Sequence, residues 1–392
     1  MEIVREKELK WLSDNSFDGN IKIIIGSRRV GKSTLLNQYS DFLISSSKVK
    51  SENIIKFDFN DRLTLLNTNW TKMLKQIKVL LKPNEKNVLI IDEVQQLKKF
   101  EDLLITLQAD PIYKNNLLDI FVTGSDAKVL SSELSTYFVG RYLDLWLYPI
   151  EFSSLNKVLS QQNKTENNCQ TTLTNFEIYK NNGGMGKIIP FYSNFEKVKL
   201  ELKVLFEDIL KKDIFSKIKN QAEFYSVLNY LFDNIGKEFS SLNVEKYLKA
   251  NKISNISYKT INEYAKKICD CSLMIRVDYF DVKGKRILVS NPKYYSYDLG
   301  ILSYKNNFQS KNYGYFLENI VLLELKSNGY EVYTYKNYQG KEVDFLAIKN
   351  GFITYFQVTK ELIWKTEANN NWEREVGNIS SIKDFHKKII IC

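Results

Sequence analysis

Histidine and cysteine are scarce in this sequence, and their scarcity excludes several kinds of catalytic site. The only histidine among 392 residues is His386, which argues against Ser-His-Asp and Cys-His catalysis and against histidine-ligated metals. The cysteines form no Cys-x-x-Cys pair and no zinc spacing; they are Cys169, Cys269, Cys271 and Cys392. That pattern suits a reducing compartment. We expect any catalysis to use carboxylates, lysine, Mg²⁺ and backbone amides.

Long apolar runs are missing as well. No stretch approaches membrane length, and the N-terminus (Met1-Glu-Ile-Val-Arg-Glu) is too charged for a signal peptide, so we expect a cytoplasmic protein and no membrane partner. Apolar residues make up 44% and charged residues 26%, which is typical of a globular protein. A length of 392 residues is enough for two or three domains. The net charge of +10 is consistent with a polyanionic partner. A coding bias toward Lys and Asn would give the same charge.

The strongest motif lies near the N-terminus. Residues 26–34 fit the pattern G-x-x-x-x-G-K-[ST], the phosphate-binding loop of nucleotide hydrolases. An apolar segment at 21–25 predicts a buried parallel strand before the loop, and the run from Ser33 without Gly or Pro predicts a helix after it. Backbone amides at a helix N-terminus favour a phosphate. The predicted ATP-binding residues are Gly26, Ser27, Arg28, Arg29, Val30, Gly31, Lys32, Ser33 and Thr34, with Lys32 on the outer phosphates and Ser33 on Mg²⁺.

A second motif has the form of a Walker B strand. In residues 87–93, Asn87 is followed by four apolar residues and then by Asp92 and Glu93. Asp92 is expected to orient Mg²⁺, and Glu93 is expected to polarise the attacking water as the catalytic base. The alternative is structural, with both acids capping the helix expected at 97–107.

Polar residues also follow the next predicted strand, at 117–122. Thr123 and Ser125 are the candidates for sensing the γ-phosphate, because polar residues at the carboxyl ends of such strands face the nucleotide. Ser125 could equally serve as a helix cap. Arg141 is a candidate to neutralise transition-state charge, either in its own chain or across a subunit interface. Its alternative role is a surface ion pair.

Taken in order, these motifs resemble a family. The runs GSRRVGKSTLL, VLIIDEVQ, FVTGSDAKVLSSELSTYFVGR and YPIEF, followed by NNGGMGKIIP, KYYSYDLGIL, YGYFLENIVLLEL and KEVDFL, look like those of uncharacterised AAA-superfamily ATPases of bacteria and archaea. The likeness covers most of the chain. It implies an ATPase core, a winged-helix-like middle and a C-terminal domain of restriction-endonuclease type.

The middle of the chain has its own pattern. Residues 161–175 are polar and are interpreted as a linker or mobile loop, and 182–186 as a flexible joint. Helical spacing at 221–231, 242–248 and 257–271, followed by two strands joined at Lys283-Gly284-Lys285, predicts a winged helix-turn-helix. Its third helix would enter the DNA major groove. The alternative is a protein-interaction module. The outward residues of that helix are predicted to be Lys259, Thr260, Asn262, Lys266 and Lys267.

The C-terminal segment predicts a helix at 313–328, then strands at 331–335, 342–346 and 353–359. This is the order of restriction-type nucleases, in which an Asp and an E-x-K pair hold a metal. Glu318 and Asp344 match that pattern as a vestigial second metal site. The third position reads Gln357-Val358-Thr359, so the lysine is missing and cleavage is doubtful. Lys360 is expected to point to the opposite face of the strand.

These patterns predict an α/β protein with a parallel P-loop NTPase sheet and three further segments. The predicted boundaries are 1–155 for the ATPase, 156–220 for a linker and helical segment, 221–300 for the winged helix and 301–392 for the nuclease-like domain. The expected function is ATP hydrolysis with Mg²⁺, coupled to binding of double-stranded DNA. The alternatives are an ATP-gated, Mg²⁺-dependent DNA nuclease and a signalling or scaffold ATPase. The sequence leaves oligomerisation open.

Overall fold

The computed structural model describes residues 3–60, 69–125, 138, 140–162, 169–281, 286–309, 313–336, 340–360 and 371–392. The chain forms two compact units, Met1–Leu147 and Tyr148–Cys392. The division falls just after β5 (Tyr142–Trp146), the last strand of the first unit. The ATPase is predicted to end at residue 155, eight residues further along the chain. The predicted tip at 283–285 lies outside the described residues.

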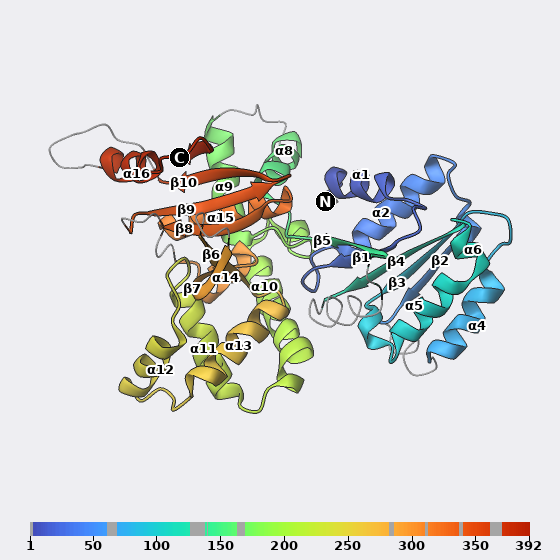
Figure 1. Ribbon diagram of the computed structural model, residues 1–392, viewed down its shortest axis with the longest axis horizontal. Helices are drawn as coiled ribbons and strands as arrows, with labels where there is room; N and C mark the ends of the chain where they lie inside the picture. The colour runs from blue at the N-terminus through green and yellow to red at the C-terminus, as the bar shows by residue number, and fades with distance from the viewer. Residues whose placement is uncertain are drawn as a thin grey trace. The chain divides into compact units, whose positions relative to one another are not determined.

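The first unit is built on a five-stranded sheet in which each described pair of neighbours is parallel (Figure 1). The strand order is β2-β3-β4-β1-β5, so β4 lies between β1 and β3. The carboxyl ends of parallel strands meet at one edge, which brings the segments after β1, β3 and β4 together. The strands are β1 (Ile21–Ile25), β2 (Ile54–Asp58), β3 (Asn87–Asp92), β4 (Leu118–Gly124) and β5 (Tyr142–Trp146).

Helices cover both faces of this sheet because its strands are apolar on both sides. Alternate residues of β1, such as Ile21 and Ile23, join a core with residues of α4 and α5, whereas Phe121 of β4 contacts Tyr39 of α2 on the other face, 5.2 Å between ring centroids. The helices are α1 (Glu6–Asp14), α2 (Lys32–Ser45), α4 (Trp70–Leu80), α5 (Phe100–Ala109) and α6 (Pro111–Lys114), with 3₁₀ turns η1 (Ser51–Asn53) and η2 (Val94–Gln96).

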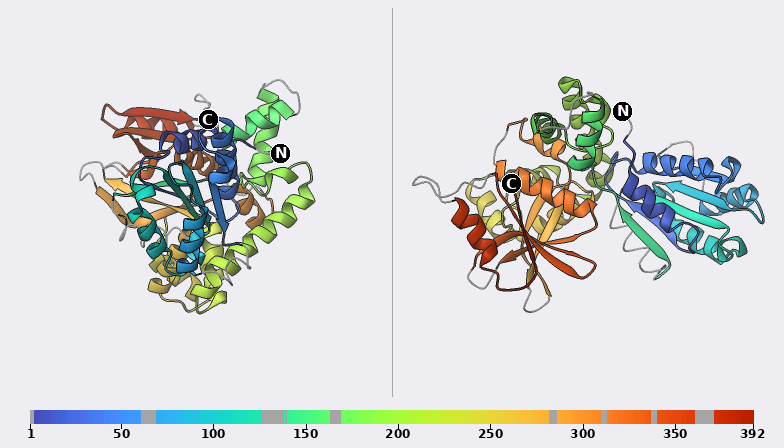
Figure 2. Two further views of the ribbon diagram at one scale, coloured as in Figure 1. Left: turned by 90° about the vertical axis from the view of Figure 1, so that its right-hand side faces the viewer. Right: turned by 90° about the horizontal axis from the view of Figure 1, so that it is seen from above.

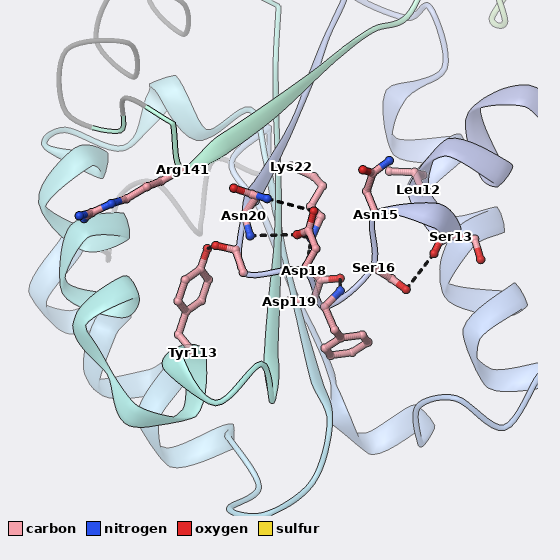
Figure 3. A network of polar contacts seen from close by, with 12 residues as sticks. Leu12, Ser13, Asn15, Ser16, Asp18, Asn20, Lys22, Tyr113, Asp119 and Arg141 are labelled. Atoms are coloured by element: carbon pink, nitrogen blue, oxygen red, sulfur yellow. Dashed lines mark hydrogen bonds and ion pairs between the residues drawn. The ribbon is translucent and has the colours of Figure 1, made fainter.

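A buried ion cluster lies at the amino end of the sheet (Figure 3). Lys22 of β1 is fully buried, and its ammonium lies 2.6 Å from Asp119 of β4 and 2.7 Å from Asp18. Asp119 also accepts a hydrogen bond from the Phe17 amide, at 2.9 Å. Burial raises the pKa of Asp119, and the neighbouring Lys22 charge counteracts that rise. The cluster therefore fixes β1 against β4 at the end of the sheet opposite the phosphate loop.

The second unit begins with helices. The predicted linker at 161–175 is wrong in part, because α9 already begins at Cys169. Its polar residues hide a helix whose Phe176 packs edge-on against Phe152 of α8, at 5.5 Å. The helices predicted at 221–231, 242–248 and 257–271 are confirmed. The helices are α8 (Phe152–Gln162), α9 (Cys169–Asn182), α10 (Phe195–Ile209), α11 (Gln221–Asp233), α12 (Ser241–Ala250), α13 (Tyr258–Asp270) and α14 (Leu299–Lys305), with the short turns η3 (Ile189–Phe191), η4 (Leu210–Ile214) and η5 (Phe215–Lys217).

The glycine segment at 182–186 is closely packed, which contradicts its prediction as a flexible joint. A Cβ on Gly183 would lie 2.4 Å from Asp298, and one on Gly184 would lie 2.1 Å from the Ile150 carbonyl oxygen. Asp298 is fully buried and accepts hydrogen bonds from the amides of Gly184 and Ile301, at 2.8 and 3.0 Å. Burial raises the pKa of Asp298 to about 6, against the effect of these amides. The glycines are therefore needed for close approach of the backbone.

One six-stranded sheet joins the rest of the second unit (Figure 2). Its order is β11-β10-β9-β8-β6-β7, and β6 pairs in parallel with β8 at Tyr279 and Thr334. Strands from the predicted winged helix and from the predicted nuclease-like segment thus share one sheet. The elements are β6 (Met274–Asp281), β7 (Arg286–Ser296), α15 (Tyr313–Ser327), β8 (Glu331–Lys336), β9 (Glu342–Lys349), β10 (Phe352–Val358), α16 (Asn371–Ser380) and β11 (Lys387–Ile391).

We predict that Lys22→Met destabilises the protein by about 3–5 kcal/mol, because it leaves the Asp119 carboxylate buried without its cation. The double variant Lys22→Met/Asp119→Asn should recover most of that loss, since it removes both charges and keeps an acceptor for the Phe17 amide. Equilibrium urea unfolding measures both effects, with the exposed Lys10→Met as the control. Equal stabilities of wild type and Lys22→Met would show that the cluster is not important for folding.

Candidate functional site

The phosphate loop has a backbone that only glycine permits at two positions. A Cβ on Gly26 would lie 2.5 Å from the Leu147 carbonyl oxygen, and Gly31 has a φ of +112°. Helix α2 begins at the next residue, Lys32. The loop therefore presents its amides at a helix N-terminus, directly after β1, which is the arrangement that binds phosphate.

The side chains of the loop divide into buried and accessible groups. Lys32 is buried, and its ammonium donates to the carbonyl oxygens of Gly26 and Ser27, at 3.0 and 3.2 Å. The hydroxyl of Ser27 is buried and forms no hydrogen bond within the described part of the chain. Of the other predicted residues, Val30 is buried, Arg28 and Gly31 are half-buried, and Arg29, Ser33 and Thr34 are exposed.

Asp92 joins the loop to the neighbouring strands. It ends β3, and its two carboxylate oxygens accept hydrogen bonds from the hydroxyls of Ser33 and Thr123. A serine hydroxyl beside a carboxylate is the donor set that holds Mg²⁺ in phosphate-loop enzymes. Neither Asp92 nor Glu93 caps the helix that follows, because α5 begins at Phe100 with Lys99 before it. The alternative structural reading of the two acids is therefore wrong.

Glu93 lies beside Lys32, with 3.2 Å between its carboxylate and the ammonium. Ser125 donates a hydrogen bond to the same carboxylate at 2.9 Å, and Gln95 donates another at 2.6 Å. Burial alone would raise the pKa of Glu93, but the charges of Lys32 and Arg28 and the two hydrogen bonds lower it below its ordinary value. Glu93 is therefore an ionised carboxylate in a buried position.

Two contributors to this site were not predicted from the sequence. Gln95 lies two residues after Glu93, and only that spacing could have suggested it. Arg5 lies on the segment before α1, and its guanidinium donates to the Val30 carbonyl oxygen of the loop at 2.8 Å. Arg5 is 7% exposed. It links the N-terminal segment to the phosphate loop, and no motif around it indicates this.

Arg141 lies away from the site. Its carbonyl oxygen accepts a hydrogen bond from the amide of Ile21, at the amino end of β1, whereas the phosphate loop follows the carboxyl end. Figure 3 shows its exposed side chain pointing away from Lys22 and Asp119. The strand separates the two ends by roughly 15 Å. Arg141 therefore does not complete the site of its own chain, and the in-chain role considered for it is wrong.

The donor set at the carboxyl edge fits a magnesium-bound triphosphate. The loop amides and Lys32 would hold the phosphates, and Ser33 and Asp92 would hold the metal ion. Thr123, near the end of β4, and Ser125, just after it, lie against Asp92 and Glu93. The structure thus brings together Lys32, Ser33, Asp92, Glu93, Thr123 and Ser125.

The second predicted metal site, in the other unit, has a different character. Glu318 of α15 accepts a hydrogen bond from the Tyr295 hydroxyl, and Asp344 of β9 accepts one from the Val358 amide, both at 2.7 Å. Gln357 and Thr359, at the positions of the expected E-x-K pair, are 5% and 6% exposed. Within the described ranges no group of three His, Cys, Asp or Glu side chains could hold a metal ion.

Two family models match this chain. The family described as "AAA domain" matches residues 18–156, and "Domain of unknown function (DUF8612)" matches residues 173–312. The first unit carries an AAA-type P-loop domain. The match and the site geometry support ATP binding by this AAA domain. The second match extends from the predicted linker and helical segment, through the predicted winged helix, to just before α15.

Whole-chain relatives and a solved structure extend the comparison. An uncharacterised protein of Haemophilus influenzae is 29% identical, over 99% of this chain and 93% of its own length. Uncharacterised protein MJ1544 of Methanocaldococcus jannaschii is also 29% identical, over 98% and 82%. The Walker-type ATPase PABY2304 of Pyrococcus abyssi has a similar fold, with a TM-score of 0.53 and 14% identity, over 78% of this chain and 98% of that one.

Among the helices that the structure describes, none is both long and apolar enough to cross a bilayer.

Proposed function

We propose that this protein hydrolyses ATP in its AAA domain and that the nucleotide state changes how its second unit engages double-stranded DNA. The observation that carries the first part is the carboxyl edge of the first sheet, where Lys32 pairs with Glu93 and Ser33 bonds to Asp92. These are the groups that phosphoryl transfer to water requires: a cation for the phosphates, a metal site and a carboxylate base.

The residues of the site act on different parts of the reaction. Glu93 polarises the attacking water, and its lowered pKa keeps it in the basic form at neutral pH. Mg²⁺ held by Ser33 and Asp92 neutralises phosphate charge when it is bound. A phosphate competes with Glu93 for the Lys32 ammonium, so binding releases Glu93 from its ion pair. Ser125 and Gln95 keep the carboxylate in place when that pair opens.

The variant Glu93→Gln tests the role of this carboxylate as the base. The variant should bind ATP about as tightly as wild type, because the amide keeps the shape of the side chain. Its turnover should fall roughly 10²–10⁴-fold, because the base is lost. Steady-state phosphate release together with equilibrium ATP binding separates the two effects. Turnover equal to that of wild type would exclude Glu93 as the base.

We further propose that Arg141 completes the active site of a neighbouring copy of the chain. It is exposed and lies at the end of β1 opposite the phosphate loop. A guanidinium in that position can reach a nucleotide only in another subunit, where it would neutralise charge on the transferred phosphoryl group. The active form would then be an oligomer in which each site has residues from two chains.

Mixing two inactive variants tests this arrangement. Glu93→Gln keeps Arg141, and Arg141→Ala keeps Glu93, so a mixed oligomer contains sites in which both groups are intact. We predict that the mixture hydrolyses ATP faster than either variant alone, measured at the same total protein concentration. A mixture of Glu93→Gln with Lys32→Ala is the control, since both changes damage the same half of the site. Equal rates for the two mixtures would contradict a role for Arg141 across an interface.

The case for DNA rests on α11, α12, α13 and the β6–β7 pair. Helix α13 buries Ile261, Tyr264, Ala265 and Ile268 and leaves Lys259, Asn262 and Lys266 exposed. Three helices followed by two antiparallel strands are the elements of a winged helix, whose third helix enters the major groove. The exposed lysines of α13 would contact phosphates.

Neutralising those lysines should weaken DNA binding. We predict that Lys259→Gln/Lys266→Gln lowers affinity for duplex DNA and reduces the slope of log K against log salt by about 2, one phosphate contact for each lysine. The matched control is Lys72→Gln/Lys75→Gln, two exposed lysines of α4 in the other unit. Fluorescence anisotropy over a salt series measures both. An unchanged slope would contradict phosphate contacts by α13.

A protein partner is the second candidate function for this module. Leu242 and Tyr247 of α12 are 54% and 48% exposed, and Ile253 after it is 51% exposed. Exposed apolar side chains on α12 and just after it would favour protein contact over DNA contact if they formed one surface. Binding to a partner through them would change little with salt, which distinguishes it from phosphate binding.

A further inference from the structure

A chain of alternating acids and bases connects the helical part of the second unit to its sheet. Lys336 of β8 forms an ion pair with Glu238, which precedes α12, and lies 3.7 Å from Glu342 of β9. Glu342 forms a second ion pair with Lys293 of β7. Tyr279 of β6 donates a hydrogen bond to Glu238 at 3.0 Å. The chain thus joins β7 and the segment before α12 to strands β8 and β9.

The Lys293 end of this chain enters the nuclease-like site. Lys293 is 6% exposed, and its partner Glu342 lies two residues before Asp344, on the same face of β9. Tyr295, two residues after Lys293 on β7, donates its hydrogen bond to Glu318. Burial lowers the pKa of Lys293, but the three carboxylates raise it by more, so that it lies above its ordinary value. The sequence places no lysine in the third position of the metal motif. The structure supplies a lysine from β7, a strand outside the segment predicted to be nuclease-like.

The donor set does not fit a divalent metal ion. Glu318 is bonded to the Tyr295 hydroxyl, Asp344 to the Val358 amide and Glu342 to the Lys293 ammonium. Mg²⁺ takes near-octahedral oxygen ligands, usually one or two carboxylates together with waters, and it neutralises the charge of those carboxylates. A second cation would also lie against a buried ammonium that already neutralises these acids. One lysine therefore does what a metal ion does for the carboxylates of a nuclease.

We propose that Lys293 takes the place of the divalent cation in the nuclease-like site, which makes the site a metal-free ionic junction that holds β7 and the helical module on the C-terminal sheet. The junction cleaves no DNA. Its role is to fix the orientation of the module predicted to bind DNA. That role rests on the proposed function, but the tests below measure metal binding and stability, so their outcome does not depend on ATP hydrolysis or DNA binding.

Metal binding by the full-length chain tests the proposal. All samples carry Asp92→Asn, which removes a carboxylate from the first metal site, and Mn²⁺ binding is followed by electron paramagnetic resonance without nucleotide. We expect no Mn²⁺ bound in this parent at millimolar metal. Mn²⁺ bound by the parent and lost on Asp344→Asn would overturn the proposal, and so would Mg²⁺-dependent DNA cleavage lost on Asp344→Asn.

Stability variants test the role of the lysine. Lys293→Ala should lower the melting temperature by roughly 5 °C or more, since it leaves the buried Glu318 and the half-buried Glu342 and Asp344 without their cation. Lys293→Arg should keep most of the stability because it keeps the charge. The exposed Lys387→Ala of β11 is the control. If Lys293→Ala melts like this control, the junction is not held by Lys293 and the proposal fails. If Lys293→Ala does not fold, that loss supports the junction, and the Mn²⁺ measurement on the parent still decides whether the site binds metal.

Discussion

The ion pair between Lys32 and Glu93 is the interaction on which the first unit depends. The Lys32 ammonium is shared between two loop carbonyls and the carboxylate of Glu93, so a single charge links the phosphate loop to the end of β3. Ser125 links Glu93 in turn to the segment after β4. An anion that binds the loop changes this sharing. Because Ser125 and Gln95 also hold Glu93, the carboxylate would keep its place if Lys32 turned to a bound phosphate. The pair is therefore both a structural contact and the point at which a nucleotide would be detected.

Three of the lysines that are buried in the described part of the chain, Lys22, Lys32 and Lys293, have surroundings that differ in a way that separates structure from function. Lys22 lies between Asp18 and Asp119 at the amino end of the first sheet, away from the site. Lys293 lies among carboxylates in the second unit that already have protein partners. Lys32 is different, because exposed Ser33 and Thr34 follow it at the start of a helix. An accessible helix N-terminus beside a buried cation favours a ligand, whereas an enclosed cation balanced by acids favours a structural role.

The sequence predicts the first site well because its parts are short motifs on strands whose order follows from the fold class. Asp92, Glu93, Thr123 and Ser125 come together since the carboxyl ends of parallel strands must meet. The position of Arg141 could not be predicted from its local motif, because only the pairing of β5 with β1 shows at which end of the sheet it lies. The ion pair of Lys293 on β7 with Glu342 on β9 could not be predicted. It depends on the order of the strands in the six-stranded sheet, which no local sequence pattern shows. Residues 169–175 form the start of a helix, although their polar composition predicts a loop. The glycines at 183 and 184 are typical of a flexible segment, but here they are required for close packing of the backbone.

The central claim is that the first unit holds a magnesium-bound triphosphate through Lys32 and the loop amides. Isothermal titration of the folded full-length protein with Mg²⁺-ATP, in wild type and in Lys32→Ala, tests it most directly. We expect saturable binding by wild type at one site for each chain. The affinity of the variant should be at least about tenfold weaker, equivalent to a loss of about 1.4 kcal/mol of binding free energy. Absence of binding by wild type, or equal affinity in Lys32→Ala with both proteins shown to be folded, would contradict it.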